Sequence, residues 1–129
     1  YRDDEGLECN ETRYMSRSPI LPSQTITGRR MRTLREERGW SQEQVGVAIG
    51  LDESSSRARI SRYELGVHEP PLPTAKLIAE VLGVPLMYLY CEDDALATLL
   101  LALHGLDAKR RKAAIKRCLD TVVSASIAA

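Results

Sequence analysis

The chain of 129 residues contains no phenylalanine, one tryptophan, eight glycines and six prolines. Leucine, alanine, arginine and glutamate are abundant instead, and this composition favours helices over strands. No apolar run approaches the roughly 18 residues that a membrane span needs. Residues 1–14 are acidic and polar, whereas a secretory leader would be basic and then apolar. These absences predict an all-α, cytoplasmic protein that makes no membrane contact.

Residue types that carry chemistry are also scarce. The three cysteines, Cys9, Cys91 and Cys118, are odd in number, widely spaced and free of any CxxC pair. Neither a disulfide framework nor a zinc site is supported by this spacing. The chain has two histidines and shows no paired-carboxylate or Ser/His arrangement. We therefore expect no catalytic residue, no metal and no cofactor, and a binding protein in place of an enzyme.

Positive charge is unevenly distributed along a chain whose net charge is zero. Residues 29–64 carry eight arginines against six acids, and residues 101–129 carry six basic residues against two acids. Between them, residues 65–100 hold one lysine and five acids. A local basic patch can bind phosphate even when the whole chain is neutral. Nucleic acid therefore remains a candidate partner.

The first helices are predicted from apolar spacing and capping residues. Residues 1–25 show no apolar period and are expected to form a flexible leader. A helix is predicted over residues 27–38, and the glycine that follows can take the left-handed conformation that ends helices. Ser41 and Gln44 then form a capping-box pattern, which predicts a second helix over residues 42–49.

The rest of the chain also has helical periodicity. A third helix is expected to end near residues 65–66, and Thr74 and Asp107 are candidate caps of later helices. The later helices are predicted over residues 74–82, 86–90, 95–104 and 108–123. The residues expected to face inward are Ile60, Tyr63, Glu64, Val67, Leu77, Ile78 and Val81. Two further apolar stripes are formed by Leu96, Leu99, Leu100 and Leu103, and by Ile115, Leu119 and Val122. The tail after these helices is expected to be too short to hold itself.

Three stretches in order carry a resemblance: GRRMRTLREERGWSQEQVGVAIG, ISRYELG and PLPTAKLIAEVLGVPLMYLY. Together they are similar to the helix-turn-helix domains of the Cro and C1 repressor type, also called XRE-like. The resemblance implies a five-helix lambda-repressor-like DNA-binding domain over residues 26–91. Residues 92–129 would form an additional helical segment, whose leucine stripe needs a cover, either the last helix or a second copy of the chain. We expect dimerisation.

The resemblance also assigns roles to particular residues. The residues expected to read DNA bases are Ser56, Arg57, Ala58, Arg59 and Arg62. The residues expected to contact DNA phosphates are Ser41, Gln42, Ser61 and His68. Arg35 and Glu64 match a pair that ties helix one to helix three. An arginine grips guanine with two hydrogen bonds, worth ~1 to 3 kcal/mol of discrimination, so we expect half-sites that contain guanine.

Two positions depart from the family pattern. Gly46 replaces the usual alanine in helix two, although both residues keep the side chain small where helix three crosses. The segment before helix three, DESSS, makes the spacing four residues longer than usual, about one helical turn at ~3.6 residues per turn. Either the turn is a longer loop capped by Ser56, or helix three starts a turn earlier behind Asp52, Ser54 or Ser55.

The resulting hypothesis is a sequence-specific, nucleoid-associated transcriptional regulator that binds double-stranded DNA. We expect a repressor that binds an inverted repeat as a homodimer, with its two reading helices about one DNA turn apart. The basic run at residues 109–112 is either a solvated face or a second phosphate contact. An alternative is an antitoxin-like or adaptor-like module that binds a protein partner and contacts DNA only secondarily.

Overall fold

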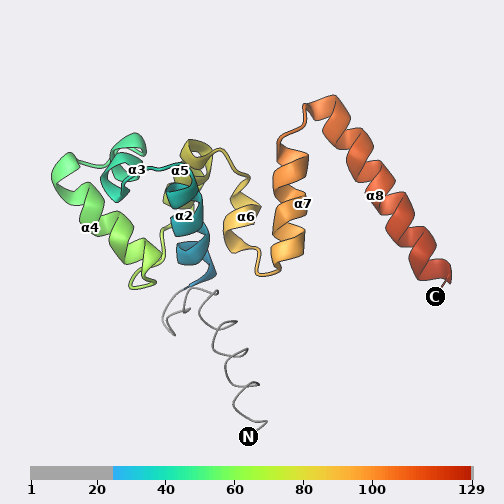
Figure 1. Cartoon of the computed structure of the whole chain (residues 1–129), viewed down its shortest axis with the longest axis horizontal. Helices are drawn as coiled ribbons and strands as arrows, with labels where there is room; N and C mark the ends of the chain where they lie inside the picture. The colour runs from blue at the N-terminus through green and yellow to red at the C-terminus, as the bar shows by residue number, and fades with distance from the viewer. Residues whose placement is uncertain (1–24, 129) are drawn as a thin grey trace, which may run out of the picture.

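The computed structural model describes residues 25–128, and within this range it contains seven α-helices and no strand. All of them except the last pack into one body, and the last helix projects away from it (Figure 1). The helices are α2 (Ile26–Glu37), α3 (Gln42–Ala48), α4 (Glu53–Glu64), α5 (Leu72–Leu82), α6 (Leu86–Tyr90), α7 (Asp94–His104) and α8 (Ala108–Ala128). The predicted all-α class is confirmed. The predicted leader lies almost wholly outside the described residues.

The start of each of the first two helices is fixed by a capping side chain. The Thr25 hydroxyl accepts a hydrogen bond from the Gly28 amide at 3.0 Å, which satisfies one of the free donors of α2. At α3 the predicted capping box is present: the Gln44 amide donates to Ser41 Oγ, and the Ser41 amide donates to Gln44 Oε1. Both helix starts are therefore dictated by local sequence.

Helix α4 takes the earlier of the two predicted starts. It begins at Glu53 behind Asp52. The four residues by which the spacing before this helix exceeds the usual one therefore add a turn to the helix and do not lengthen the loop. The Asp52 side chain caps no amide and instead accepts a hydrogen bond from the Ser54 hydroxyl. Glu53 in the first turn stabilises the helix through its macrodipole.

The crossing of α3 and α4 depends on a position without a side chain. A Cβ atom built on Gly46 would lie 2.4 Å from Cβ of Ser56 and 2.9 Å from its Cα. These distances leave no room even for alanine, the residue that the family usually places there. The predicted need for a small residue at this crossing is therefore correct, and Ser56 makes the requirement stricter.

The core of the body is formed by mostly aliphatic residues, and each helix from α2 to α7 contributes to it. Its fully buried members include Met31, Ile60, Ile78, Leu82 and Leu89. Each fully buried residue of this size contributes about 1.5–3 kcal/mol relative to exposure. This burial holds α3 and α4 in place at one end of the molecule.

Three expectations for α4 and α5 are wrong. Val67 lies beyond the end of α4 and is exposed, because α4 ends at Glu64. Leu77 is exposed as well, since α5 buries Ala75, Ile78, Ala79 and Leu82 instead. Helix α5 starts at Leu72 behind Pro71, so Thr74 lies inside the first turn and caps nothing. Proline in the first turn fits a helix start as well as a capping hydroxyl does.

Helix α7 belongs to the packed body. Ala97 is buried in the core cluster and Leu101 packs against it, whereas Leu96 and Leu99 of the predicted stripe are exposed. The side of α7 that faces the body is thus the one with the smaller side chain. The body consequently extends past the predicted domain boundary at residue 91.

Two arginines of α2 reach the start of α7: Arg29 lies 3.6 Å from the Asp94 carboxylate, and Arg30 makes the closer contacts. The Arg30 guanidinium donates two hydrogen bonds to the Cys91 carbonyl, at 3.2 and 2.7 Å, and lies 2.9 Å from the Asp94 carboxylate. It also lies 5.1 Å from the centroid of the Tyr88 ring, a cation–π contact. Arg30 is nearly buried. The start of α7 is therefore fixed relative to α2, which also packs against α4.

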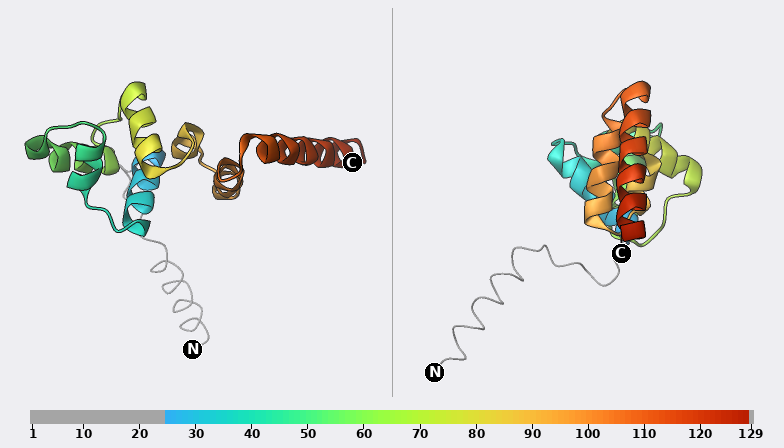
Figure 2. Two further views of the ribbon diagram at one scale, coloured as in Figure 1. Left: turned by 90° about the horizontal axis from the view of Figure 1, so that it is seen from above. Right: turned by 90° about the vertical axis from the view of Figure 1, so that its right-hand side faces the viewer.

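Helix α8 differs from the other helices because none of its residues is buried. The Arg110 amide donates to Asp107 Oδ1, so Asp107 caps it as predicted. The helix runs through Ala128, and the expectation of an unstructured tail after residue 123 is therefore wrong. Figure 2 shows α8 as a straight rod that leaves the body. Among residues 25–128, no helix combines the length and apolarity that a bilayer crossing requires.

Candidate nucleic-acid interface

Helices α3 and α4 form the end of the molecule opposite α8 (Figure 1). Helix α4 buries Ser56, Ile60, Tyr63 and Glu64 against the body. At about 100° per residue, the side opposite these four is formed by Ser54, Ala58, Ser61 and Arg62. All four are exposed or half-exposed. This polar outward face is where a ligand could approach α4.

The arginines of α4 do not all point the same way. Arg62 lies on the outward face beside Ala58, whereas Arg57 and Arg59 lie on opposite flanks, since two residues are separated by roughly 200° around a helix. All three arginines are exposed. Arg57 lies on the α3 side, where it lines a shallow polar hollow together with Arg35, Ser41, Gln42 and Glu43. The hollow thus brings together residues that were predicted to have different roles.

The expectation that Ser56 reads bases is wrong for this structure. Ser56 has 0% exposed surface, and its hydroxyl donates to the Asp52 carbonyl at 2.8 Å. The early start of α4 places it one turn before Ile60 on the inward side. It packs against Gly46, so it has no route to a ligand without unpacking the α3–α4 crossing.

Behind the outward face, Glu64 holds two side chains from other helices. The predicted ion pair is present, with Arg35 donating to Glu64 at 2.6 and 3.1 Å. Gln42 Nε2 donates to the same carboxylate at 2.9 Å. Arg35 also donates to the Trp40 carbonyl at 2.9 Å. Glu64 is 3% exposed, so this network ties α2, α3 and α4 together below the surface.

The network also keeps Arg35 positively charged. The hydrogen bond to Glu64 raises the pKa of Arg35 above its ordinary value, although burial works against this. Arg35 therefore stays cationic, and the buried Glu64 carboxylate keeps a cationic partner. An unpaired charge at such a depth would be costly.

Gln42 keeps hydrogen-bonding capacity on its outer side. A primary amide has two N–H donors, and the Glu64 carboxylate takes one of them. Because the amide is held by Glu64, its second donor is aimed before a ligand arrives. Ser41 is exposed and its oxygen accepts from Gln44, which leaves its own O–H free to donate.

The other two predicted phosphate contacts lie further along α4. Ser61 is half-exposed on the outward face, and His68 is exposed just past the end of the helix. Both positions are compatible with contact to a ligand that spans the length of α4. The structure does not bring His68 into the hollow that holds Ser41, Gln42 and Arg57.

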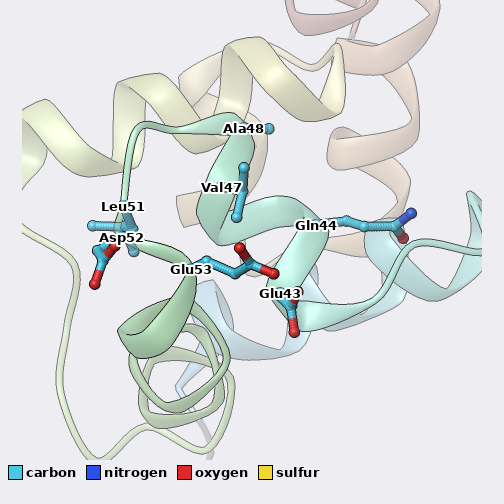
Figure 3. Close-up of a pocket in the computed structure, with 7 residues that line it drawn as sticks. All are labelled: Glu43, Gln44, Val47, Ala48, Leu51, Asp52 and Glu53. Carbon is cyan, nitrogen blue, oxygen red and sulfur yellow. The ribbon is translucent and has the colours of Figure 1, made fainter.

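An acidic groove flanks this surface, between α3 and the start of α4. Its volume is about 540 Å³, and it is lined by Glu43, Gln44, Val47, Ala48, Leu51, Asp52 and Glu53. Figure 3 shows Glu53 reaching toward α3 beside Val47 and Glu43, while Asp52 points away. The carboxylates therefore do not converge. Across residues 25–128, no group of three or more Asp, Glu, His or Cys side chains could hold a metal ion.

Sequence reasoning missed Arg30 as a structural residue. Its partners Cys91 and Asp94 lie 61 and 64 positions away, and no local pattern links such distant positions. A weak signal was available, because an arginine on the same side of a helix as buried apolar residues needs a partner. Met31 and Leu34 of α2 are such residues.

A helix-turn-helix family model matches residues 31–89. The solved structure of the transcriptional regulator BswR is 38% identical, with a TM-score of 0.67, and the match covers 76% of this chain and 96% of that chain. No curated protein matches. The matched segment contains α3, α4 and the hydrogen-bonded network around Glu64. The chain belongs to the XRE-like helix-turn-helix family of transcriptional regulators.

Proposed function

We propose that the protein is a sequence-specific DNA-binding regulator that represses transcription by occupying its operator as a homodimer. The observation that carries the proposal is the outward face of α4, which is polar, exposed and supported from below by the buried Glu64 network. A rigid helix with an open polar face suits the major groove of B-DNA, whose width of ~12 Å admits one helix.

Base reading is assigned to the outward face and its flanks. Arg62 and Ala58 would contact base edges directly, because they lie farthest from the body. Arg57 and Arg59 would lie along the two walls of the groove, within reach of base edges or of the backbone. A bidentate arginine–guanine contact would provide ~1–3 kcal/mol of discrimination. Ser56 has no part in this assignment.

Phosphate contacts are assigned to the α3 side. Gln42 would donate its free N–H and Ser41 its hydroxyl to the backbone, while Ser61 and His68 would contact phosphates further along. These contacts position the protein and carry no sequence information. The Glu64 network supports the assignment because it orients Gln42 without a ligand.

Two copies would associate through their C-terminal helices, and the dimer would bind an inverted repeat with its two α4 helices. This binding would take place in the cytoplasm. Half-sites on one face of the duplex must be separated by a whole number of turns. Repression would follow from exclusion of the polymerase at the occupied site. The exposed apolar residues of α7 and α8 support the dimer.

A gel-shift experiment tests the division between reading and positioning. Arg62→Ala should weaken binding to a site selected from the host genome by roughly 5- to 150-fold, the equivalent of ~1–3 kcal/mol, with little change on random duplex. Gln42→Ala should weaken binding to both duplexes. Lys76→Ala on α5 is a control, because it removes one exposed positive charge away from α4. Equal losses on both duplexes for Arg62→Ala would reject its role as a base reader.

A second candidate is a protein-interaction module with secondary DNA contact, and the acidic groove favours it. The groove combines an apolar floor of Val47 and Leu51 with Glu43 and Glu53, which suits a basic segment of a partner. Co-expression with the product of the neighbouring gene discriminates the two candidates. A stoichiometric complex that Glu43→Lys abolishes, combined with only non-specific DNA affinity, would favour this module.

A further inference from the structure

Helix α8 exposes more apolar surface than a helix in isolation can sustain. Ile115 is 40% exposed, Leu119 59% and Val122 62%. A hollow of about 510 Å³ on this helix is lined only by its own residues, among them Ile115 and Leu119. Most of the stability of helices in proteins comes from packing of an apolar face, and an exposed apolar surface of this kind marks a contact site. Something outside the described chain must cover α8.

One arginine holds α8 at an open angle to α7. Arg111 Nε donates to the Leu103 carbonyl at 2.9 Å, and its Nη2 donates to the carbonyls of His104 and Leu106 at 3.1 and 2.8 Å. These bonds satisfy carbonyls at the end of α7. Beyond this joint the two helices diverge (Figure 1). The side chains along the open angle are therefore not buried by each other.

Both sides of the open angle are apolar. On α8, Ile115, Cys118, Val122 and Ala125 follow Arg111 at intervals of four, three, four and three residues, so they share its side of the helix. On α7, Leu96 and Leu99 lie opposite the body-facing Ala97 and Leu101 and are 50% and 42% exposed. A further helix in the angle would contact both sides.

We infer that the open angle between α7 and α8 receives α8 of a second copy of this chain, running antiparallel to the first. The inference rests on the proposed homodimer and specifies its interface. Aromatic residues are absent from α8, whereas helices that lie on membrane surfaces usually carry tryptophan or phenylalanine. This favours a protein occupant.

The charge on α8 selects the antiparallel direction. The first half of the helix holds six basic residues and no acid, and the second half holds only Asp120. A parallel pair would place six positive charges beside six, which is unfavourable. The antiparallel pair places each basic half beside a half with one acid. It also brings the partner's basic half beside Glu92, Asp93 and Asp94 at the start of α7.

A two-fold axis through the middle of α8 fixes the register. Cys118 is the central residue of Ala108–Ala128. Across such an axis Arg111 lies opposite Ala125 and Cys118 lies opposite its own copy, while Ile115 and Val122 of the two copies are offset by one residue, about 1.5 Å along the helix. The stripe is thus self-complementary, as an isologous interface requires. Cys118 then reports the register directly, since it is exposed in the single chain.

Disulfide trapping of the full chain, without DNA, tests the register. In a Cys9→Ser/Cys91→Ser background, mild oxidation should convert most of the protein to a covalent dimer through Cys118. Two controls add Cys118→Ser to this background. Ser124→Cys places the thiol on the far side of α8, and Ala125→Cys keeps it on the stripe but away from the axis. Both should cross-link at least about tenfold more slowly. Equal rates for Cys118 and Ser124→Cys, or faster cross-linking of Ala125→Cys, would overturn the inference.

Sedimentation of the full chain provides the second measurement. Val122→Asp should raise the dimer dissociation constant at least ~100-fold, because it places a charge in each half of the interface. Ser124→Asp, on the far side of α8, should leave it unchanged. A monomeric wild-type chain would overturn the inference, as would one whose α8 binds vesicles of anionic lipid. A monomeric chain would also reject the homodimer of the proposed function, whereas a dimer that Val122→Asp leaves intact would reject only this interface. DNA reading by α4 is tested separately by the gel shift, so the failures are distinguishable.

Discussion

The exposed surfaces at the two ends of the molecule differ in polarity and in how the protein supports them. At the α3–α4 end the surface is polar, and the buried Glu64 carboxylate holds Arg35 and Gln42 in fixed positions. At the α8 end an apolar stripe is exposed beside basic residues, no residue of α8 is buried, and one arginine sets the direction of the helix. A polar face supported by a buried network is organised before its ligand arrives, whereas an uncovered apolar face is completed by its partner.

The largest effect should come from removing the support of the polar end. We expect Glu64→Ala to cost about 3–5 kcal/mol in the free energy of unfolding, because it strands the charge of Arg35 and releases Gln42. Urea denaturation measures this. Arg32→Ala, which removes an exposed pair with Glu36, should cost under about 1 kcal/mol. Equal losses would show that the Glu64 network does not support this end.

The next effect concerns the crossing that positions α4. We expect Gly46→Ala to cost about 1–3 kcal/mol, although alanine has the better helix propensity, because the new methyl group would collide with Ser56. Gly105→Ala is a matched control, since a Cβ there would lie no closer than 3.6 Å to its neighbours and φ is −69°. A stabilised Gly46→Ala protein would contradict the close crossing.

A smaller effect should come from removing the contacts of Arg111, which connect the start of α8 to the end of α7. In a Val122→Asp background, Arg111→Gln should speed hydrogen exchange of α8 amides about tenfold, near 1.4 kcal/mol, because three carbonyl contacts are lost. The amides of α4 should not change. Arg110→Gln loses only an exposed pair with Asp107 and should have little effect. Equal acceleration by both variants would show that Arg111 is not the joint.

The smallest effect should show whether the acidic groove beside α4 lies within the DNA footprint. Glu53→Gln should raise affinity for DNA roughly two- to fivefold at low salt, since it removes a negative charge beside the α4 face, and the gain should shrink as salt screens it. Glu80→Gln on α5 should change affinity less. An unchanged or lower affinity for Glu53→Gln would mean that the acidic groove lies outside the DNA footprint.

Sequence reasoning succeeded where the determinant is local. The capping box of Ser41 and Gln44 predicts the start of α3 because both partners lie within one turn, and the glycine after α2 has the expected left-handed φ of 66°. The Arg35–Glu64 pair was found only through the family resemblance. Ser56 was expected to read bases but is buried. Local sequence did not predict this, because the exposure of Ser56 depends on where α4 starts. The spacing of Ser56 to Ile60 and Tyr63, four and seven residues, did carry the inward signal.

The remaining misses concern packing between distant segments. Leu77 belongs to a valid helical stripe, but which side of a helix faces the core depends on neighbours far away in sequence. Ala97 is buried in place of the larger leucines because α7 approaches α6 closely, and Arg30 fixes that approach. Sequence periodicity predicts that a stripe exists and does not say which surface will cover it.

The position of α4 and α8 at opposite ends of the chain has a consequence for operator architecture (Figure 1). In a dimer joined at α8, the whole body of each protomer separates its α4 from the symmetry axis. A one-turn spacing, ~34 Å, suits reading helices that adjoin the axis. Here we expect palindromic arms set two or more turns apart, seen in nuclease footprints as two short protected windows around an accessible, freely variable spacer.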